Sequence, residues 1–232
     1  CNLNCSYCGG GFSGENLQFD VRYSLSQLKK FLSQDNELVT IHFYGGEPLL
    51  RIDLIYEIMK LIPHAKFILQ TNGLLLHKLK KTMINNFHTI LVSIDGRREV
   101  TDYYRGRGVY KKVIANVKKL REAGFTGDLV ARMTVSERTD IFKDVLHLLN
   151  LNLFDHVHWQ CDFLWDSDPK IRWNNLDEWI RKSYNPGISR LVELWVKKIE
   201  KGIVLGIVPF LGIMKTMIMN VKSQLRCGAG LD

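Results

Sequence analysis

The chain has 232 residues, of which 46% are hydrophobic and 24% charged, a composition typical of an ordered globular protein and unlike that of a disordered one. The longest apolar stretch, residues 203–219, is interrupted by glycine, proline and lysine, so no segment has the length of a membrane span. Basic residues outnumber acidic ones, 32 against 24. The Lys-Lys pairs fall inside amphipathic patterns, which favours solvated helix faces over a nucleic-acid surface.

The cysteines do not form the pattern of a disulfide framework. Cys1, Cys5 and Cys8 crowd the first loop, whereas Cys161 and Cys227 stand far away in the sequence. Disulfide-rich domains instead carry an even number of cysteines spread along a short chain. We therefore expect reduced thiols and a cytoplasmic protein.

The first loop has the spacing CxxxCxxC, formed by Cys1, Cys5 and Cys8. Thiolates spaced this closely ligate iron–sulfur clusters or zinc. Structural zinc needs a fourth Cys or His, and the nearest candidates in the sequence are His42 and Cys161. The spacing therefore favours an iron–sulfur cluster with one open metal position, and a zinc site assembled across the fold is the alternative.

Strands and helices alternate along the chain. The predicted strands are residues 39–44, 67–70, 89–94, 129–135 and 156–161. The predicted helices are one capped by Ser24 with Phe31 at a core position, residues 52–61, a segment through Leu79, Met83 and Ile84, residues 109–123 and residues 141–149. This alternation implies right-handed βαβ crossovers and a parallel sheet. The loops after the strands would then meet at one rim, where active sites lie in α/β folds.

The last third of the chain differs from the part before it. Residues 173–185 are polar and aromatic, and residues 203–219 are apolar and irregular. Between them, residues 188–201 have the spacing of a helix with Leu191, Leu194 and Trp195 facing inward. We expect this part of the chain to pack outside the sheet.

Three polar motifs stand at the ends of predicted strands. Gly45-Gly46-Glu47-Pro48 would let backbone and a carboxylate approach a small cationic ligand, although an ordinary strand-to-helix turn can have the same residues. Gln70-Thr71-Asn72-Gly73 could contact a ligand or simply form an Asn-Gly turn. Ser93-Ile94-Asp95-Gly96 could contact a ligand or cap the next helix.

Four further residues are candidates for the site. Arg105 could pair with a ligand carboxylate through a bidentate contact, or be a solvated loop residue. Arg132 lies centrally in a strand, and because an unpaired buried charge is costly, it should face a ligand or a structural salt bridge. Cys161 and Asp162 close the last strand and are candidates for touching substrate, with a buried core role favoured for Cys161.

Together these motifs resemble those of the radical SAM enzymes. The likeness rests on the CxxxCxxC loop with an aromatic residue, Tyr7, before its last Cys, and on GGEP, TNG and SIDG after successive strands. In the SIDG relatives a His-Asp-x-x-Arg element follows. Here Asp102 and Arg105 match that element, but Thr101 stands where the His would be. The resemblance covers residues 1–165 and the last six residues.

The resemblance implies an α/β fold, a partial (β/α)6 TIM-like barrel whose first strand lies before residue 1. Residues 1–165 would form the radical SAM core, 166–226 a helical extension packed on it, and 227–232 the start of a SPASM-like domain. Cys227 would then belong to an auxiliary iron–sulfur cluster completed by cysteines beyond residue 232, or be a plain free thiol.

The resemblance also implies two cofactors, a [4Fe–4S] cluster held by Cys1, Cys5 and Cys8, and S-adenosylmethionine (SAM) bound to its fourth iron. Glu47 would hold the SAM amino group, Ser93 would contact the ribose, and Arg105 would lie at the carboxylate or ribose side. The full set of expected cofactor-binding residues is Tyr7, Gly45, Gly46, Glu47, Gln70, Asn72, Ser93 and Arg105.

Membership of this family would make the protein an enzyme that cleaves SAM reductively to a 5′-deoxyadenosyl radical and abstracts a substrate hydrogen. Relatives with these motifs mostly modify peptides or proteins, as the anaerobic sulfatase-maturating enzymes do. We therefore expect a peptide or protein substrate, with ferredoxin or flavodoxin as electron donor. Molybdopterin-precursor cyclases are the alternative within the family, because GGEPLLR and TNGLLL also resemble theirs. A non-catalytic zinc or nucleic-acid-binding module is the alternative outside it.

Overall fold

The computed structural model describes residues 1–8, 21–34, 38–162 and 173–220. Its centre is one sheet of five parallel strands, which neighbour one another in the order of the chain. The strands are β1 (Thr40–Phe43), β2 (Lys66–Thr71), β3 (Phe87–Ser93), β4 (Asp128–Val135) and β5 (His156–Cys161). The predicted α/β class with a parallel sheet is confirmed.

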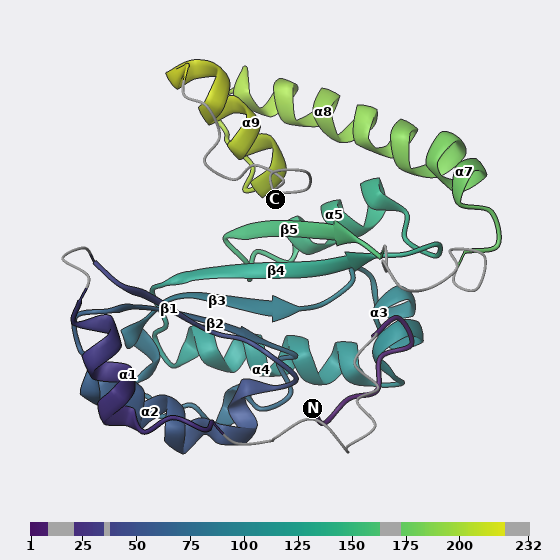
Figure 1. Ribbon diagram of the computed structural model, residues 1–232. Helices are drawn as coiled ribbons and strands as arrows, with labels where there is room; N and C mark the ends of the chain where they lie inside the picture. Colours follow the sequence, from purple (N-terminus) through teal and green to yellow (C-terminus); the bar gives the residue numbers. More distant parts are fainter. Residues whose placement is uncertain (9–20, 35–37, 163–172, 221–232) are drawn as a thin grey trace, which may run out of the picture.

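Helices connect the strands and continue after the last one. Figure 1 shows α2 and α4 below the sheet and α8 and α9 above β5. The helices are α1 (Leu25–Leu32), α2 (Ile52–Leu61), α3 (Arg98–Arg105), α4 (Val109–Glu122), α5 (Ile141–Asn150), α7 (Leu176–Trp179), α8 (Asn185–Ile199) and α9 (Val208–Met219). The predicted Ser24 cap of α1 is confirmed, because Ser24 and Gln27 form a reciprocal capping box.

One face of the sheet is buried beneath helices. Successive residues of β3 alternate between buried and half-buried positions, with Ile90 and Val92 fully buried. Val92 lies close to Val113 of α4, since a Cβ atom built on Gly73 would lie within 3.1 Å of a methyl carbon of each. The apolar residues of the strands and helices join here in the main hydrophobic core.

The opposite face of the sheet carries several polar side chains. The strand register places Ser93 beside Arg132, and Arg132 beside His158, so these side chains point to the same side of β3, β4 and β5. Gln70 of β2 shares this side, because it alternates with two buried neighbours on its strand. We call the side defined by Gln70, Ser93, Arg132 and His158 the inward face.

Two predicted segments differ from the structure. The predicted helix through Leu79, Met83 and Ile84 is replaced by two short 3-10 turns, η2 (Leu76–Lys78) and η3 (Ile84–Asn86). The Lys80 backbone N–H between them donates to the Tyr56 hydroxyl at 2.8 Å. In contrast, residues 203–219, predicted to be irregular, contain the helix α9, which begins with proline in its first turn.

Two smaller differences concern α1 and α3. Phe31, predicted at a core position, is 67% exposed. The polar segment after β3 contains the helix α3, which ends at Gly106 with a positive φ of 114°. Its helical spacing brings Val100, Thr101 and Arg105 to one buried side.

The helices after β5 contact the outer side of the sheet. Gly187 of α8 lies so close to α5 that an added Cβ would be 2.4 Å from an Ile141 methyl carbon. Phe210 of α9 packs edge-on against Trp159 of β5 and against Trp195 of α8. No helix of the described residues is long and apolar enough to cross a membrane.

Candidate active site

The cysteine loop lies at the carboxyl ends of the strands. Figure 1 shows the purple N-terminal segment close to α3, on the side to which the arrowheads of β4 and β5 point. The Ser6 backbone N–H donates to the Tyr104 carbonyl of α3 at 2.9 Å. At the other end of the loop, a Cβ on Gly46 would lie 3.0 Å from the Cys1 nitrogen. The loop therefore spans the rim from the β1 turn to α3.

The donor set of the loop fits an iron–sulfur cluster. Cys1 and Cys8 are exposed and Cys5 is half-buried, and all are free thiols. Among the residues that the structure describes, no three Cys, His, Asp or Glu side chains converge where a single metal ion could bind them. A mononuclear zinc site needs such convergence, whereas each thiolate of a cubane cluster binds a different iron. Burial raises the pKa of the Cys5 thiol, and a bound cation would favour its thiolate form.

Glu47 joins the ends of β1 and β2. Its carboxylate is 5% exposed and accepts hydrogen bonds from Leu49 N at 3.0 Å, Thr71 Oγ1 at 2.8 Å and Asn72 N at 2.7 Å. An ionised carboxylate offers about four acceptor positions, so these bonds leave about one for a ligand. Glu47 thus holds the rim together, in addition to its predicted contact with the SAM amino group.

Asn72 attaches the TNG turn to the cysteine loop. Its Nδ2 donates to Asn2 Oδ1 at 2.6 Å and lies 3.9 Å from Cys1 Sγ. Its Oδ1 accepts from Leu74 N at 3.0 Å. The side chain therefore contacts the predicted cluster ligand, and an N–H donor at a ligand sulfur tunes the potential of an iron–sulfur centre.

Asp95, which follows β3, joins the parts of the rim on the side of α3. It is fully buried, and Arg105 makes a bidentate pair with it, with Nε and one terminal nitrogen each 2.8 Å from a carboxylate oxygen. The Tyr7 hydroxyl donates to the same carboxylate at 2.7 Å, and Thr134 N does so at 3.0 Å. Burial raises the pKa of Tyr7 well above its usual value. One carboxylate thus connects β3, β4, α3 and the cysteine loop.

Arg105 pairs with Asp95 in the structure, whereas the sequence predicted a ligand carboxylate or solvent beside it. Its side chain is 7% exposed and faces Asp95, with its guanidinium 5.4 Å from the centre of the Tyr7 ring. Although burial alone would lower it, the pKa of Arg105 is raised by the charge of Asp95. The structure therefore shows Arg105 orienting the loop residue Tyr7, and its predicted contact with SAM stays a prediction.

Gln70, Ser93 and Gly45 remain available to a ligand. No hydrogen bond joins the side chains of Gln70 and Ser93 to other residues in the described part of the chain, and both are half-buried on the inward face. Gly45 has a positive φ of 143°, and no atom lies within 4 Å of the position of a Cβ. Its backbone is therefore open to close approach.

Other candidates lie away from this rim or outside the described residues. Cys161 alternates with the inward-facing positions of β5 and points to the helical side, where burial raises the pKa of its thiol. Asp162 accepts from Ser136 Oγ at 3.3 Å, and its carbonyl accepts from the Trp173 indole at 3.1 Å. Cys227 and the predicted start of a further domain lie outside the described residues.

Sequence reasoning missed the residues that hold the motifs together. Asp95 was visible within SIDG as a polar residue at a strand end, but its pairing with Arg105 needed the position of α3. Thr71 and Asn2 were visible only as parts of TNG and of the cysteine loop. Their roles depend on contacts between motifs that are distant in the chain, since Thr71 donates to Glu47, 24 positions earlier, and Asn2 accepts from Asn72, 70 positions later.

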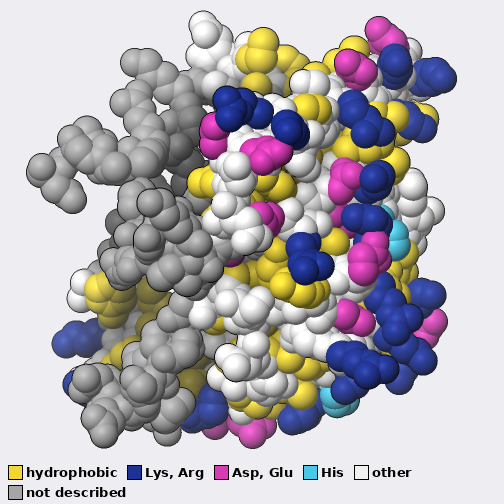
Figure 2. Space-filling view, turned by 90° about the vertical axis from the view of Figure 1, so that its right-hand side faces the viewer, with side chains coloured by type: hydrophobic (Ala, Val, Ile, Leu, Met, Phe, Trp, Pro, Cys, Tyr) yellow, Lys and Arg dark blue, Asp and Glu magenta, His cyan; other side chains and the backbone are white. Residues whose placement is uncertain are grey.

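The surface at this end of the molecule carries both signs of charge. Figure 2 views the side that lies at the right of Figure 1, and shows Lys and Arg interspersed with Asp and Glu. A surface that attracts nucleic acid needs a patch of Lys and Arg side chains without acidic residues among them. Among the described residues visible in Figure 2, Asp and Glu lie between the Lys and Arg side chains.

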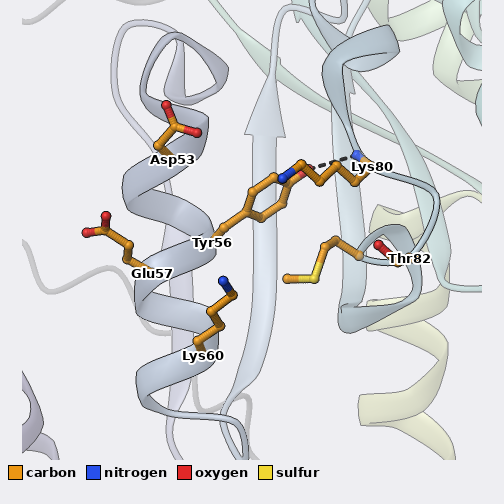
Figure 3. Close-up of a pocket in the computed structure, with 7 residues that line it drawn as sticks. Asp53, Tyr56, Glu57, Lys60, Lys80 and Thr82 are labelled. Carbon is orange, nitrogen blue, oxygen red and sulfur yellow. Dashed lines mark hydrogen bonds between the residues drawn. The ribbon is translucent and has the colours of Figure 1, made fainter.

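A separate cleft of about 440 Å³ lies between α2 and the turns after β2. Figure 3 shows Lys80 beside the ring of Tyr56, to whose hydroxyl its backbone N–H donates. The lining residues are Asp53, Tyr56, Glu57, Lys60, Lys80, Thr82 and Met83. None of them belongs to the strand-end motifs, so this cleft is distinct from the candidate active site.

Comparison with known proteins identifies the family. The family model described as the Radical SAM superfamily matches residues 1–149, which is more than half of the chain. The chain belongs to the radical SAM superfamily, and this family implies a [4Fe–4S] cluster and SAM as cofactors.

Individual relatives match different shares of the chain. An uncharacterized protein of Methanothermobacter thermautotrophicus is 28% identical over 183 residues, which are 73% of this chain and 68% of that protein. A probable GTP 3′,8-cyclase of Archaeoglobus fulgidus is 31% identical over 133 residues, 54% of this chain and 43% of the cyclase. A solved structure of native anSMEcpe with bound AdoMet and Cp18Cys peptide is 21% identical, with a TM-score of 0.77, and covers 98% of this chain.

The likeness to anSMEcpe establishes the fold. The five parallel strands and their helices form a partial TIM-like barrel of the radical SAM type, as predicted. The chain spans 65% of the anSMEcpe chain and 43% of the cyclase. At these identities the comparisons show the superfamily and the fold.

Proposed function

We propose that this protein is a radical SAM enzyme that abstracts hydrogen from a peptide or protein during its modification. The observation that carries the proposal is the extent of the structural likeness. The fold of anSMEcpe, which binds AdoMet and a peptide, covers 98% of the chain, far beyond the 1–149 matched by the family model. The match to the GTP 3′,8-cyclase covers 54%.

The chain's own residues would bind and orient the cofactors. Cys1, Cys5 and Cys8 would ligate the cluster, and Asp95 would keep Tyr7 and the rest of the loop in place. When bound, the reduced cluster supplies the electron that splits SAM into methionine and a 5′-deoxyadenosyl radical able to take a hydrogen atom. The protein's part in such chemistry is to position the cofactors and to shield the site from water when they are bound.

We assign the SAM-binding surface to the rim between β1 and β3. The backbone of Gly45 and Gly46 and the remaining acceptor position of Glu47 would receive the amino group. Gln70 and Ser93, which have no side-chain partner among the described residues, would supply hydrogen bonds to the nucleoside. Unpaired polar groups at these positions are suited to a polar ligand, because each gains a hydrogen bond on binding.

The second candidate is a GTP cyclase of the molybdopterin-precursor type. The observation that favours it is the 31% identity to the Archaeoglobus protein over 133 residues. The non-catalytic zinc or nucleic-acid module has less support, since the surface in Figure 2 mixes both charges. We further propose a cytoplasmic enzyme reduced by ferredoxin or flavodoxin, because free thiols and iron–sulfur clusters persist in reducing compartments.

Cofactor chemistry is the first test of this function. Protein purified without oxygen and reconstituted with iron and sulfide should be brown and contain about four irons at the Cys1–Cys5–Cys8 site, as expected for a [4Fe–4S] centre. With dithionite it should convert SAM to 5′-deoxyadenosine, and Cys5→Ala should lose both colour and product. Colourless protein with one zinc per chain would rule out the proposal.

Transfer of deuterium tests the substrate class. A tryptic digest of fully deuterated bacterial protein and fully deuterated GTP are offered separately to the reconstituted enzyme, and 5′-deoxyadenosine is analysed by mass spectrometry. Deuterium arriving from the digest supports a peptide substrate. Deuterium arriving only from GTP supports the cyclase and contradicts the peptide proposal.

A further inference from the structure

Arg132 lies on the inward face and has no acidic partner among the residues that the structure describes. Within the described residues its only hydrogen bond joins one terminal nitrogen to the Met133 carbonyl at 3.2 Å. The side chain is half-buried, and burial lowers the pKa of Arg132. The other half-buried or buried arginines of the described residues are paired, Arg105 with Asp95, Arg97 with Asp144 and Arg121 with Asp155. Arg132 is thus a partly desolvated cation that a ligand anion could neutralise.

His158 lies next to Arg132 and likewise has a ring nitrogen without a partner in the described part of the chain. The strand register pairs the two residues across β4 and β5. The Nδ1 atom of His158 is buried and makes no hydrogen bond to any described residue. In contrast, His156, two residues earlier on the same face, has its Nδ1 atom 2.6 Å from an Asp128 carboxylate oxygen. A buried polar atom without a partner is unfavourable, so an occupant that supplies a partner would be favoured.

The two side chains together have the chemistry of an oxyanion site. Burial and the adjacent Arg132 lower the pKa of His158 to about 4, so the imidazole is neutral near pH 7 and has one N–H to donate. A guanidinium binds a carboxylate in a bidentate manner, and a neighbouring N–H donor can satisfy a further lone pair. Arg132 supplies the only full charge of this pair at neutral pH.

We propose that Arg132 and His158 form a binding site for a carboxylate group of the substrate, on the inward face of β4 and β5. This site deepens the proposed peptide-modifying function and rests on it, since the carboxylate would belong to an acidic side chain or chain end of the peptide. The net charge of +8 is in keeping with an acidic partner. Specificity for acidic peptides would follow from this contact.

The pair lies beside the proposed SAM surface and continues from it onto β5, since Ser93 is the register partner of Arg132. The cysteine loop is held at Asp95, whose carboxylate accepts from Thr134 N, two residues beyond Arg132 along β4. Gln160 is the partner of Thr134 on β5, again two residues beyond His158. Arg132 and His158 therefore lie one inward-facing position deeper in the sheet than the point where the loop is attached. Of the two, His158 is the farther from Ser93 and from the proposed SAM surface.

The titration of His158 provides a direct test in the reconstituted holoenzyme. With 13C-labelled histidine, the NMR signal of His158, assigned from the His158→Asn variant, is followed against pH with acetate, inorganic phosphate or chloride at equal ionic strength. Acetate bound beside the imidazole should raise the pKa of His158, whereas chloride should not. Arg132→Gln should abolish the response to acetate, and Arg190→Gln, which removes an arginine stacked on Phe142 of α5, should keep it.

Three results would overturn the proposal. One is a His158 signal that does not respond to acetate. The second is a larger response to phosphate than to acetate, which would assign the site to a nucleotide phosphate. The third is loss of the acetate response when SAM is added, which would assign the site to the carboxylate of the cofactor. Retention of the response with SAM bound supports the substrate site.

Deuterium transfer from the digest provides a second test of the carboxylate site. Esterification of its carboxyl groups with methanol removes the negative charges, and should abolish deuterium transfer to 5′-deoxyadenosine if Arg132 and His158 recognise a carboxylate. Equal transfer from the esterified and untreated digests would overturn the carboxylate site. Absence of transfer from the untreated digest would instead contradict the peptide-modifying function. The two failures are therefore distinguishable. In that case the acetate titration still tests whether Arg132 and His158 bind a carboxylate.

Discussion

At the residue scale, Asp95 is the side chain that connects the most parts of the site. Four donors from three different parts of the chain converge on its carboxylate, which is fully buried. A buried charge is tolerated only when it is paired and hydrogen-bonded. Because Tyr7 is one of the donors, the same interaction that neutralises Arg105 also fixes the orientation of the cysteine loop.

Replacement of Asp95 by Asn tests this hub. The Asp95→Asn variant leaves Arg105 as a buried charge without a counter-ion, which costs about 3–5 kcal/mol of unfolding free energy. We also expect a lower iron content after reconstitution, since Tyr7 loses its carboxylate acceptor. Urea denaturation and iron analysis measure the two effects. Glu99→Gln is the control, because it removes an exposed partner of Arg97. It should change the free energy of unfolding by less than about 1 kcal/mol. Equal effects in both variants would contradict the role of Asp95.

His158 should make the stability depend on pH. Burial and Arg132 lower its pKa in the folded protein from the usual 6.5 to about 4. The unfolded chain therefore binds a proton below pH 6.5 that the folded protein does not bind until about pH 4, so stability falls as the pH drops through this window. After allowance for solvent screening, we expect a loss of about 1 kcal/mol between pH 7 and pH 5.

Denaturation by urea at both pH values measures this loss. Burial also lowers the pKa of His42 and of His147, so part of the pH dependence has the same sign and persists without His158. The His158→Gln variant should therefore show a smaller difference between pH 7 and pH 5 than the wild type. An unchanged difference would show that His158 titrates at its usual pKa in the folded protein.

At the scale of elements, the turn after β1 is shaped to receive the cysteine loop. A Cβ on Gly46 would lie 3.0 Å from Cys1 N and 3.2 Å from Cys1 Cβ, closer than side chains normally approach backbone. We expect Gly46→Ala to displace the first ligand of the cluster. The variant should take up little iron on reconstitution, measured by colorimetric iron analysis and by its absorption spectrum.

Gly212 supplies the matched control for this substitution. It lies within α9, and a Cβ there would meet no atom within 4 Å. Gly212→Ala should therefore leave iron uptake unchanged and raise stability by about 0.5–1 kcal/mol, because alanine favours a helix over glycine. Normal iron uptake by Gly46→Ala would show that the loop does not depend on this close approach.

The strands, turns and helices also show how much of the structure could be predicted from the sequence. Alternating strands and glycine turns placed the rim motifs correctly, because each signal is local to one strand–turn–helix unit. The segment around Met83 was wrongly predicted as a helix, since the Tyr56 hydroxyl from α2 competes for the Lys80 N–H. That contact is tertiary and cannot be read from periodicity. The inward face was likewise only partly predictable, because Arg132 was recognised as unusual but the adjoining His158 needed the register of β5.

At the scale of the whole molecule, the sheet and the helices after it share one core. The Val157 N–H of β5 donates to the Gly206 carbonyl at 2.7 Å, and α8 lies against α5 through Gly187. Trp159, Trp195 and Phe210 form an aromatic cluster where β5, α8 and α9 meet. This junction predicts that residues 173–220 unfold together with the sheet, because neither side keeps its buried surface without the other.

Phe210 tests that coupling. It is 9% exposed between the two indole rings, so Phe210→Ala should lower the free energy of unfolding of the whole chain by about 3–5 kcal/mol. Met217, on the same helix but 76% exposed, should tolerate Ala within about 0.5 kcal/mol. Tryptophan fluorescence and far-UV circular dichroism should shift to lower urea concentration together in Phe210→Ala. If fluorescence shifted alone, α8 and α9 would unfold independently of the sheet, and the helices after β5 could not help to hold the strands that carry Arg132 and His158.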